Sequence, residues 1–166
     1  AALLISTDAA SARRVEECLR QQLERLPRRD IAVAALERYG AIFLVETLDM
    51  ALQLSNRIAP EHLELQVQDP WSCLGKIEHA GAVFMGESTP EAVGDYFAGP
   101  NHVLPTAGTA RFASALGVEN FLKRTSVISY SREALERDGA SIIRLAELEG
   151  LGAHAASVRV RLTGSP

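Results

Sequence analysis

The chain has 166 residues, of which 47% are hydrophobic and 23% are charged, a profile typical of one soluble globular domain rather than of a disordered or fibrous chain. Its 17 Lys and Arg residues against 21 Asp and Glu residues give a net charge of −4, which argues against a nucleic-acid-binding protein. The sequence contains neither an uncharged apolar run long enough to span a membrane nor the basic flank of a signal peptide. We therefore expect a cytoplasmic protein with no nucleic-acid or membrane partner.

The first residues form an apolar run, Ala1–Ser6, that already has the pattern of a core strand and is not preceded by an initiator Met. We interpret the sequence as a piece of a longer polypeptide or as a processed product. The two cysteines, Cys18 and Cys73, are too few for a disulfide framework and have no CxxC spacing. We expect both to be buried thiols rather than metal or redox groups.

The first part of the chain alternates between predicted strands and helices. In chain order we expect a strand at residues 1–6, a helix between the capping residues Ser6-Thr7-Asp8 and Pro27, a helix at 30–39 and a buried strand at 41–45. A helix at 48–58, a half-exposed strand at 63–67, a strand at 81–85 and a helix beginning at Thr89-Pro90-Glu91 follow. This alternation predicts an α/β layer structure built on a largely parallel sheet.

The pattern changes after Tyr96. Residues 98–109 are dense in Gly and Pro and predict a long loop, and such loops within a compact domain are often functional. A short helix near 118–123, a strand-like segment at 126–130 and helices at 131–149 and 153–160 are expected after it. We therefore divide the chain into an α/β portion, residues 1–130, and a helical arm, residues 131–166, that could pack on another subunit.

Glu61 and His62 follow Pro60 and lie at the start of a predicted strand. A carboxylate beside an imidazole could supply two acid–base groups to one cleft. Neighbouring side chains of a strand point to opposite faces, so a shared site would need irregular backbone, which Pro60 favours. The alternative is a pair of surface residues.

Three further residues could carry chemistry. Asp95, just before the Gly- and Pro-rich loop, is suited to be a metal ligand, a helix cap or an exposed charge. His102 lies within the loop between two prolines, which favours a positioned imidazole, whereas His154 alone would be an ordinary helix residue. His79 has no such context and is expected at the surface. The sequence has no HExxH, GxGxxG, Walker or GxSxG motif.

Several stretches together resemble the histidinol dehydrogenase family. They are Ile58-Ala59-Pro60-Glu61-His62-Leu63-Glu64, Gly94-Asp95-Tyr96, Gly99-Pro100-Asn101-His102-Val103-Leu104-Pro105-Thr106, Phe121-Leu122-Lys123-Arg124-Thr125-Ser126 and the segment from Leu148 to His154. The resemblance covers essentially the whole chain, with the motifs in the order and spacing of the family. Together with the alternation of elements, it implies an incomplete Rossmann-like layered α/β sheet followed by a mostly helical C-terminal arm.

The resemblance also implies an activity and roles for individual residues. The family is zinc-dependent and oxidises L-histidinol through histidinal to L-histidine with two molecules of NAD⁺. Residues that match the family's functional positions are Asp95 and His154 as zinc ligands, Glu61 and His62 as the acid–base pair, and His102 and Glu149 as substrate contacts, with Tyr96 expected to line the same pocket. The substrate-contacting set then comprises His62, Asp95, Tyr96, His102, Glu149 and His154.

The family pattern further implies that this chain lacks part of the site. Two more zinc ligands, a Gln and a His, and most residues that hold NAD⁺ lie in an N-terminal half that is absent here. In the family the C-terminal arm reaches across a homodimer, so that His154 would complete the partner's site. We therefore expect the C-terminal part of a dehydrogenase that is inactive alone. The alternative is a truncated, non-catalytic relative that dimerises or binds a ligand.

Overall fold

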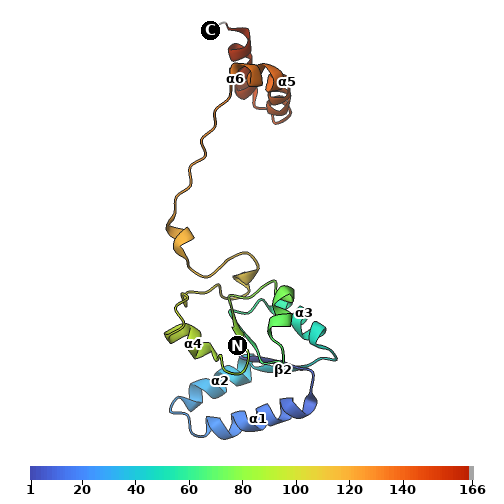
Figure 1. Cartoon of the computed structure of the whole chain (residues 1–166), viewed down its shortest axis with the longest axis vertical. Helices are drawn as coiled ribbons and strands as arrows, with labels where there is room; N and C mark the ends of the chain where they lie inside the picture. Colours follow the sequence, from blue (N-terminus) through green and yellow to red (C-terminus); the bar gives the residue numbers. More distant parts are fainter. Residues whose placement is uncertain (165–166) are drawn as a thin grey trace. The chain divides into compact units, whose positions relative to one another are not determined.

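The structure is a computed structural model that describes residues 1–164, so the last two residues of the predicted arm, 165 and 166, lie outside the described residues. The chain divides into two compact units, Ala1–Leu122 and Lys123–Pro166. Figure 1 shows the α/β elements of the first unit and the two long helices of the second.

The first unit begins with a parallel pair of strands joined by two helices. Strand β1 (Leu3–Ser6), helices α1 (Ala9–Leu23) and α2 (Arg29–Tyr39) and strand β2 (Ala41–Leu44) follow one another, and β1 pairs with β2 in parallel. The predicted cap of α1 is confirmed, because the Asp8 carboxylate accepts hydrogen bonds from the backbone N–H groups of Ala10 and Ser11. Helix α1 packs against both strands.

The expectation that residues 41–45 form a buried strand is half wrong. The strand exists, but all four residues of β2 are exposed, with Phe43 at 37% and Leu44 at 58%. An apolar run is buried on both faces only when layers cover both faces. Within the described residues β2 pairs with β1 alone, so these side chains lack such cover.

A second parallel pair forms the core that supports the candidate site. Helix α3 (Leu48–Ile58), strand β3 (His62–Leu65), the 3-10 helix η1 (Trp71–Lys76) and strand β4 (Ala82–Met85) are its elements. Strand β3 pairs with β4 so that His62 lies opposite Ala82 and Glu64 opposite Phe84. The core under the other face of this pair contains Leu52 of α3, Leu65 of β3 and Cys73 of η1.

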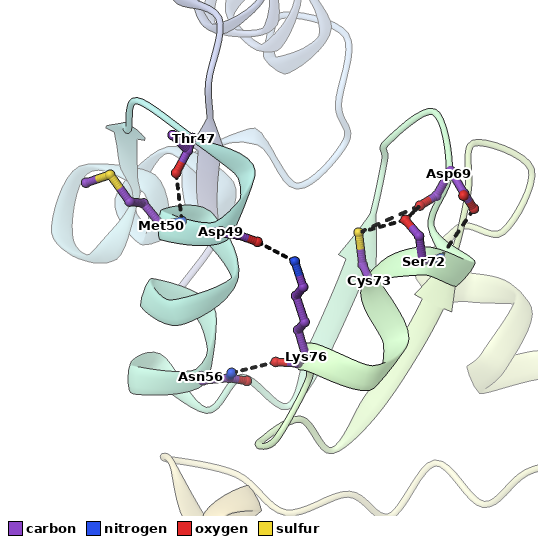
Figure 2. A network of polar contacts seen from close by, with 8 residues as sticks. All are labelled: Thr47, Asp49, Met50, Asn56, Asp69, Ser72, Cys73 and Lys76. Atoms are coloured by element: carbon purple, nitrogen blue, oxygen red, sulfur yellow. Dashed lines mark hydrogen bonds and ion pairs between the residues drawn. The ribbon is translucent and has the colours of Figure 1, made fainter.

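Polar contacts fix α3 to the end of η1, as Figure 2 shows. The Asn56 side chain donates a hydrogen bond to the Lys76 carbonyl at 2.8 Å, and its oxygen accepts one from the Glu78 backbone N–H at 2.9 Å. The Lys76 ammonium lies 2.6 Å from the Asp49 carboxylate. These contacts set where the chain leaves η1 to enter β4.

The α/β class and the parallel strand pairing are confirmed, but the layered sheet is smaller than expected. The four strands of the described residues form two separate two-stranded sheets, β1–β2 and β3–β4, and not one continuous sheet. Each strand has four residues, which is short even for a globular domain.

Short helices and long loops complete the first unit. Helix α4 (Glu91–Tyr96) follows β4, and between α4 and Leu122 the chain forms only the 3-10 turns η2 (Thr109–Arg111) and η3 (Val118–Phe121). The expected loop after Tyr96 is confirmed, because residues 97–108 form no helix or strand. The Cys prediction holds for Cys73, which is buried, and is wrong for Cys18, which is exposed on α1. His79, which was expected at the surface, is half-buried, and its backbone N–H donates a hydrogen bond to the Asn56 side-chain oxygen at 3.4 Å.

The second unit is a helical hairpin of α5 (Arg132–Leu148) and α6 (Gly152–Thr163). Its buried residues are small, namely Gly139, Ala146 and Ala155, and this allows the two helices to approach closely. The expected strand at 126–130 is wrong: residues 122–131 form no helix or strand, and Val127 and Ile128 are 91% and 86% exposed. A strand needs a partner for its backbone groups, and no described strand pairs with this segment. Among residues 1–164, no helix has the length and apolar character to cross a membrane.

Candidate functional site

His62 opens strand β3, on the same face as Glu64 because side chains alternate along a strand. Helix α4 brings Glu91 and Asp95 to it. These two residues are four apart and therefore share one side of the helix. Nε2 of His62 lies 3.7 Å from a Glu91 carboxylate oxygen and 4.0 Å from an Asp95 carboxylate oxygen. An imidazole and two carboxylates thus converge between β3 and α4.

The carboxylate of Asp95 affects the acidity of Glu91. The pKa of the Glu91 carboxyl is raised, mainly by its hydrogen bond to Asp95, then by partial burial and by the negative charge of Asp95; His62 has the opposite effect. A neutral Glu91 would donate a hydrogen bond to an ionised Asp95, as in other carboxyl pairs. The position of Glu91 is itself fixed by the sheet, because its backbone N–H donates to the Glu64 carboxylate at 3.0 Å.

His62 Nε2 is buried and has no hydrogen-bond partner among the described residues. Buried polar atoms in native proteins nearly always have a partner, so an orphaned one calls for an explanation. One ligand atom each from His62, Glu91 and Asp95 lies within 4.8 Å of the others. Imidazole nitrogen and carboxylate oxygen are ligands that Zn²⁺ accepts. Asp95, which the sequence marked as a metal ligand, therefore lies in a group of side chains whose chemistry suits a divalent ion such as Zn²⁺, with the His62 imidazole beside it.

A cavity of about 160 Å³ adjoins this cluster. Its walls come from β4, from α4 and from the loop after α4, and they include both Asp95 and His102. The loop is shaped by the Asn101 side chain, which accepts a hydrogen bond from the Val103 backbone N–H at 2.7 Å. The structure thus places two of the residues singled out in the sequence around one cavity that is mostly apolar and carries a carboxylate and an imidazole at its wall.

Glu61 and Tyr96 lie beside this site in different ways. Glu61 is half-buried directly before β3, and its carbonyl accepts a hydrogen bond from the Ala82 backbone N–H at 2.9 Å, so the irregular backbone expected near Pro60 is limited to the residues before the strand. Tyr96 ends α4 with 84% of its surface exposed. Its side chain is not part of the cavity wall within the first unit.

The remaining two candidates belong to the second unit. Glu149 is the C-terminal cap of α5 and is exposed. His154 is exposed in the first turn of α6, and its carbonyl accepts a hydrogen bond from the Ser157 hydroxyl at 2.7 Å. Both residues therefore flank the turn between the two helices of the hairpin, where their side chains are free to meet a further group.

Sequence reasoning missed Glu91. It used this residue only as a signal that a helix begins, together with Thr89 and Pro90. A usable signal was present, because a carboxylate four residues before Asp95 on a helix lies on the same side as Asp95. The fold and site define an α/β protein with a histidine–carboxylate cluster beside an apolar cavity.

Comparison with known proteins gives the family. The family model described as "Histidinol dehydrogenase" matches residues 1–162. The chain is 57% identical over 165 residues to the histidinol dehydrogenase of Syntrophotalea carbinolica and 54% identical over 162 residues to that of Thermosynechococcus vestitus. These matches cover 99% and 98% of this chain and 38% of each relative. The chain belongs to the histidinol dehydrogenase family.

A solved structure agrees with this assignment. The crystal structure of histidinol dehydrogenase from Elizabethkingia anophelis matches with a TM-score of 0.84 at 34% sequence identity, over 98% of this chain and 37% of that one. The chain therefore spans a little more than a third of the length of the relatives it matches. The predicted family is confirmed, and so is the expectation that the chain corresponds to only part of the complete enzyme.

Proposed function

We propose that this chain is the C-terminal part of a zinc-dependent histidinol dehydrogenase, which oxidises L-histidinol through histidinal to L-histidine with NAD⁺ as the acceptor of both hydrides. The observation that carries the proposal is the convergence of His62, Glu91 and Asp95 beside a cavity in a chain that belongs to this family. The proposal concerns the complete enzyme, because the chain matches about 38% of its relatives' length.

The acid–base work falls to Glu61 and His62. Each oxidation of an alcohol or an aldehyde hydrate removes a hydride from carbon and a proton from oxygen, and an imidazole is suited to take that proton near neutral pH. His62 would accept the hydroxyl proton in both oxidations. Glu61 would draw a proton from the water that adds to histidinal, giving the hydrate that the second oxidation requires. Nε2 of His62 is suited to this role because it makes no hydrogen bond within the described residues.

Asp95 of one chain and His154 of its partner would hold zinc, as the family pattern implies. When bound, the ion supplies an anchor for the imidazole and the amine of the substrate, which fixes the reacting carbon in place. Glu91 would support Asp95, since it lies one helical turn before it and the pKa of its carboxyl is raised mainly by the interaction with Asp95. His102 and Glu149 would contact the substrate, and so would the exposed side chain of Tyr96.

The geometry also explains why this chain should need the rest of the enzyme. Two protein ligands rarely hold a catalytic zinc ion tightly, and no NAD⁺-binding motif occurs in the sequence. A Gln and a His ligand and most NAD⁺ contacts would come from the segment that the relatives have and this chain lacks. A second copy of the enzyme would contribute His154 to each site, so the functional form would be a homodimer.

The experiment that tests the proposal measures NADH formation from L-histidinol in the presence of Zn²⁺. The samples are the 166-residue chain and a chimera in which this chain replaces the matching part of the Syntrophotalea carbinolica histidinol dehydrogenase. We expect the chain alone to be inactive and the chimera to be active. A folded but inactive chimera, beside an active parent enzyme, would favour a non-catalytic module. Activity of the chain alone would refute the division of the site described above.

A further inference from the structure

We propose that Gly94 is a positioning residue for the site: its missing Cβ lets α4 lie directly on Phe84, and this contact sets the spacing of His62, Glu91 and Asp95. The structural part of this proposal stands on the geometry alone. Its catalytic consequence rests on the proposed function.

Gly94 lies on the side of α4 that packs against β4. Glu91 is three residues before Gly94 and four before Asp95, so on the helix surface it neighbours both of them. Gly94 meets Phe84 of β4, while Glu91 and Asp95 approach His62 of β3, so this side of α4 faces the two strands. A Cβ built on Gly94 would lie only 2.7 Å from Cε1 and 2.9 Å from Cζ of Phe84, whereas ordinary contacts are at 3.4–4 Å. Any side chain at this position would force the helix or the ring to retreat by several tenths of an ångström.

A shift of helix α4 and a shift of the Phe84 ring would each change the site. Phe84 is only 6% exposed, and its ring lies against the imidazole of His62, with ring centroids 5.9 Å apart and planes at 41°. A shift of the ring would therefore press on His62. A shift of the helix would instead carry Glu91 and Asp95 away from Nε2 of His62, from which they lie at 3.7 and 4.0 Å. The same close contact also bounds the cavity, since Phe84, Gly94 and Asp95 are all part of its wall.

The two residues give a test by compensation. Leucine lacks both ring atoms that a Cβ on Gly94 would meet, so Phe84→Leu makes room for Gly94→Ala. If the contact is what positions the site, the effect of Gly94→Ala should vanish in the Phe84→Leu background, which is the non-additivity expected of residues in direct contact. Gly75→Ala is the matched control, because no atom lies within 4 Å of a Cβ built on Gly75 in the same unit.

The first measurement uses the 166-residue chain and needs no activity. The chain is labelled with ¹³C-histidine, and the imidazole signals are recorded at one pH, with His62→Gln to identify the His62 signal. We expect Gly94→Ala to move the His62 signal and to leave that of His154, in the second unit, in place. Gly75→Ala should move neither. The Phe84→Leu single variant and the Phe84→Leu/Gly94→Ala double variant should give the same His62 signal.

The second measurement uses the chimera and determines kcat/KM for L-histidinol under conditions where urea unfolding shows each variant to be folded. A misplacement of catalytic groups on the scale of an ångström can lower rates by about 100-fold, and we expect a loss of that order for Gly94→Ala but no further loss when it is added to Phe84→Leu. The proposal is wrong if Gly94→Ala leaves the His62 signal unmoved, or moves it equally in both backgrounds. An inactive chimera would instead refute the proposed function and leave the NMR result standing.

Discussion

Nε2 of His62 lies 3.7 Å from a carboxylate oxygen of Glu91, and this contact joins the start of strand β3 to the first turn of α4. Glu64 strengthens the same junction, since its carboxylate accepts a hydrogen bond from the Glu91 backbone N–H. The imidazole and the acidic helix are therefore held together by the sheet.

Replacing His62 by Gln in the chimera should abolish proton transfer while leaving the fold intact. General acid–base catalysis contributes about 10²–10⁴-fold to a rate, so kcat should fall by about 100-fold or more. The free energy of unfolding should change little in comparison with this loss of turnover, because the His62 side chain keeps 29% of its surface exposed. Steady-state kinetics and urea unfolding measure the two effects, and His79→Gln serves as the control. A His62→Gln enzyme with the turnover of the parent would exclude the proposed role.

Two inactive variants should restore each other if His154 acts across a homodimer. A chimera with His62→Gln and a second with His154→Gln are each expected to be inactive. When they are unfolded together and refolded as mixed dimers, one of the two sites in each mixed dimer keeps both histidines and should form NADH. If the mixture stays as inactive as either variant alone, His154 does not serve the partner's site.

The helical hairpin should lose stability in acid through Asp138. Hydrogen bonds and ionic contacts with Arg137, together with a hydrogen bond from the Tyr130 hydroxyl, lower the pKa of the Asp138 carboxyl from 3.8 to about 2. Because this pKa is depressed in the folded state, the stabilisation is present above pH 3.8 and is lost as the pH falls through about 2. Urea unfolding at a series of pH values, followed by the amide NMR signals of α5, should show the free energy of unfolding of the hairpin falling as the pH is lowered.

In Asp138→Asn the free energy of unfolding should depend less on pH. The hairpin of this variant should also be less stable than the parent above pH 3.8, where the carboxylate of the parent is charged in both the folded and the unfolded state. Asp30→Asn is the control, since Asp30 belongs to the other unit and its side chain is 99% exposed. An unchanged pH dependence in the Asp138 variant would show that its contacts do not stabilise the hairpin.

Removing the Asn56 side chain should weaken the first unit near the entrance to β4. Asn56→Ala deletes hydrogen bonds to the Lys76 carbonyl and from the Glu78 backbone N–H, which Figure 2 shows in part. Because a net hydrogen bond contributes about 0.5–1.5 kcal/mol, we expect unfolding of the first unit to become easier by about 1–2 kcal/mol. Gln53→Ala, at an exposed position of the same helix, should have a small effect. Equal effects of both changes would mean that the Asn56 contacts contribute nothing specific.

The sequence predicted local structure well where a short segment decides it. The cap at Asp8, the end of the second helix at Gly40 and the helices on either side of Glu149 depend on residues that are neighbours in the chain. Burial was predicted less well, because it depends on what covers a segment. The apolar run of β2 and the segment with Val127 and Ile128 both have the pattern of buried strands. Yet the side chains of β2 are exposed, and no described strand pairs with the segment that contains Val127 and Ile128.

The candidate site, too, could be predicted from the sequence only in part. The importance of His62 and Asp95 could be inferred from the motifs that resemble the family, whereas their approach to 4.0 Å is a property of the packing of α4 on β4. The part played by Glu91 follows from helix geometry and could have been inferred. The close fit of Gly94 on Phe84 could not, since nothing in the sequence says which ring lies opposite which residue of the helix.

The register of the β3–β4 pair restricts how the length of this region can vary. The Gly81 N–H bonds to the Pro60 carbonyl and the Ala82 N–H to the Glu61 carbonyl, so pairing starts directly at the residues that precede His62. Since successive side chains of a strand point to opposite faces, a shift of β3 by one residue would turn the imidazole toward Leu52 and Cys73. A residue lost before β3 would then place Leu63 beside Asp95, and a residue gained would place Glu61 there. Insertions in this protein should be tolerated in its long surface loops and not in the short segment that leads into β3.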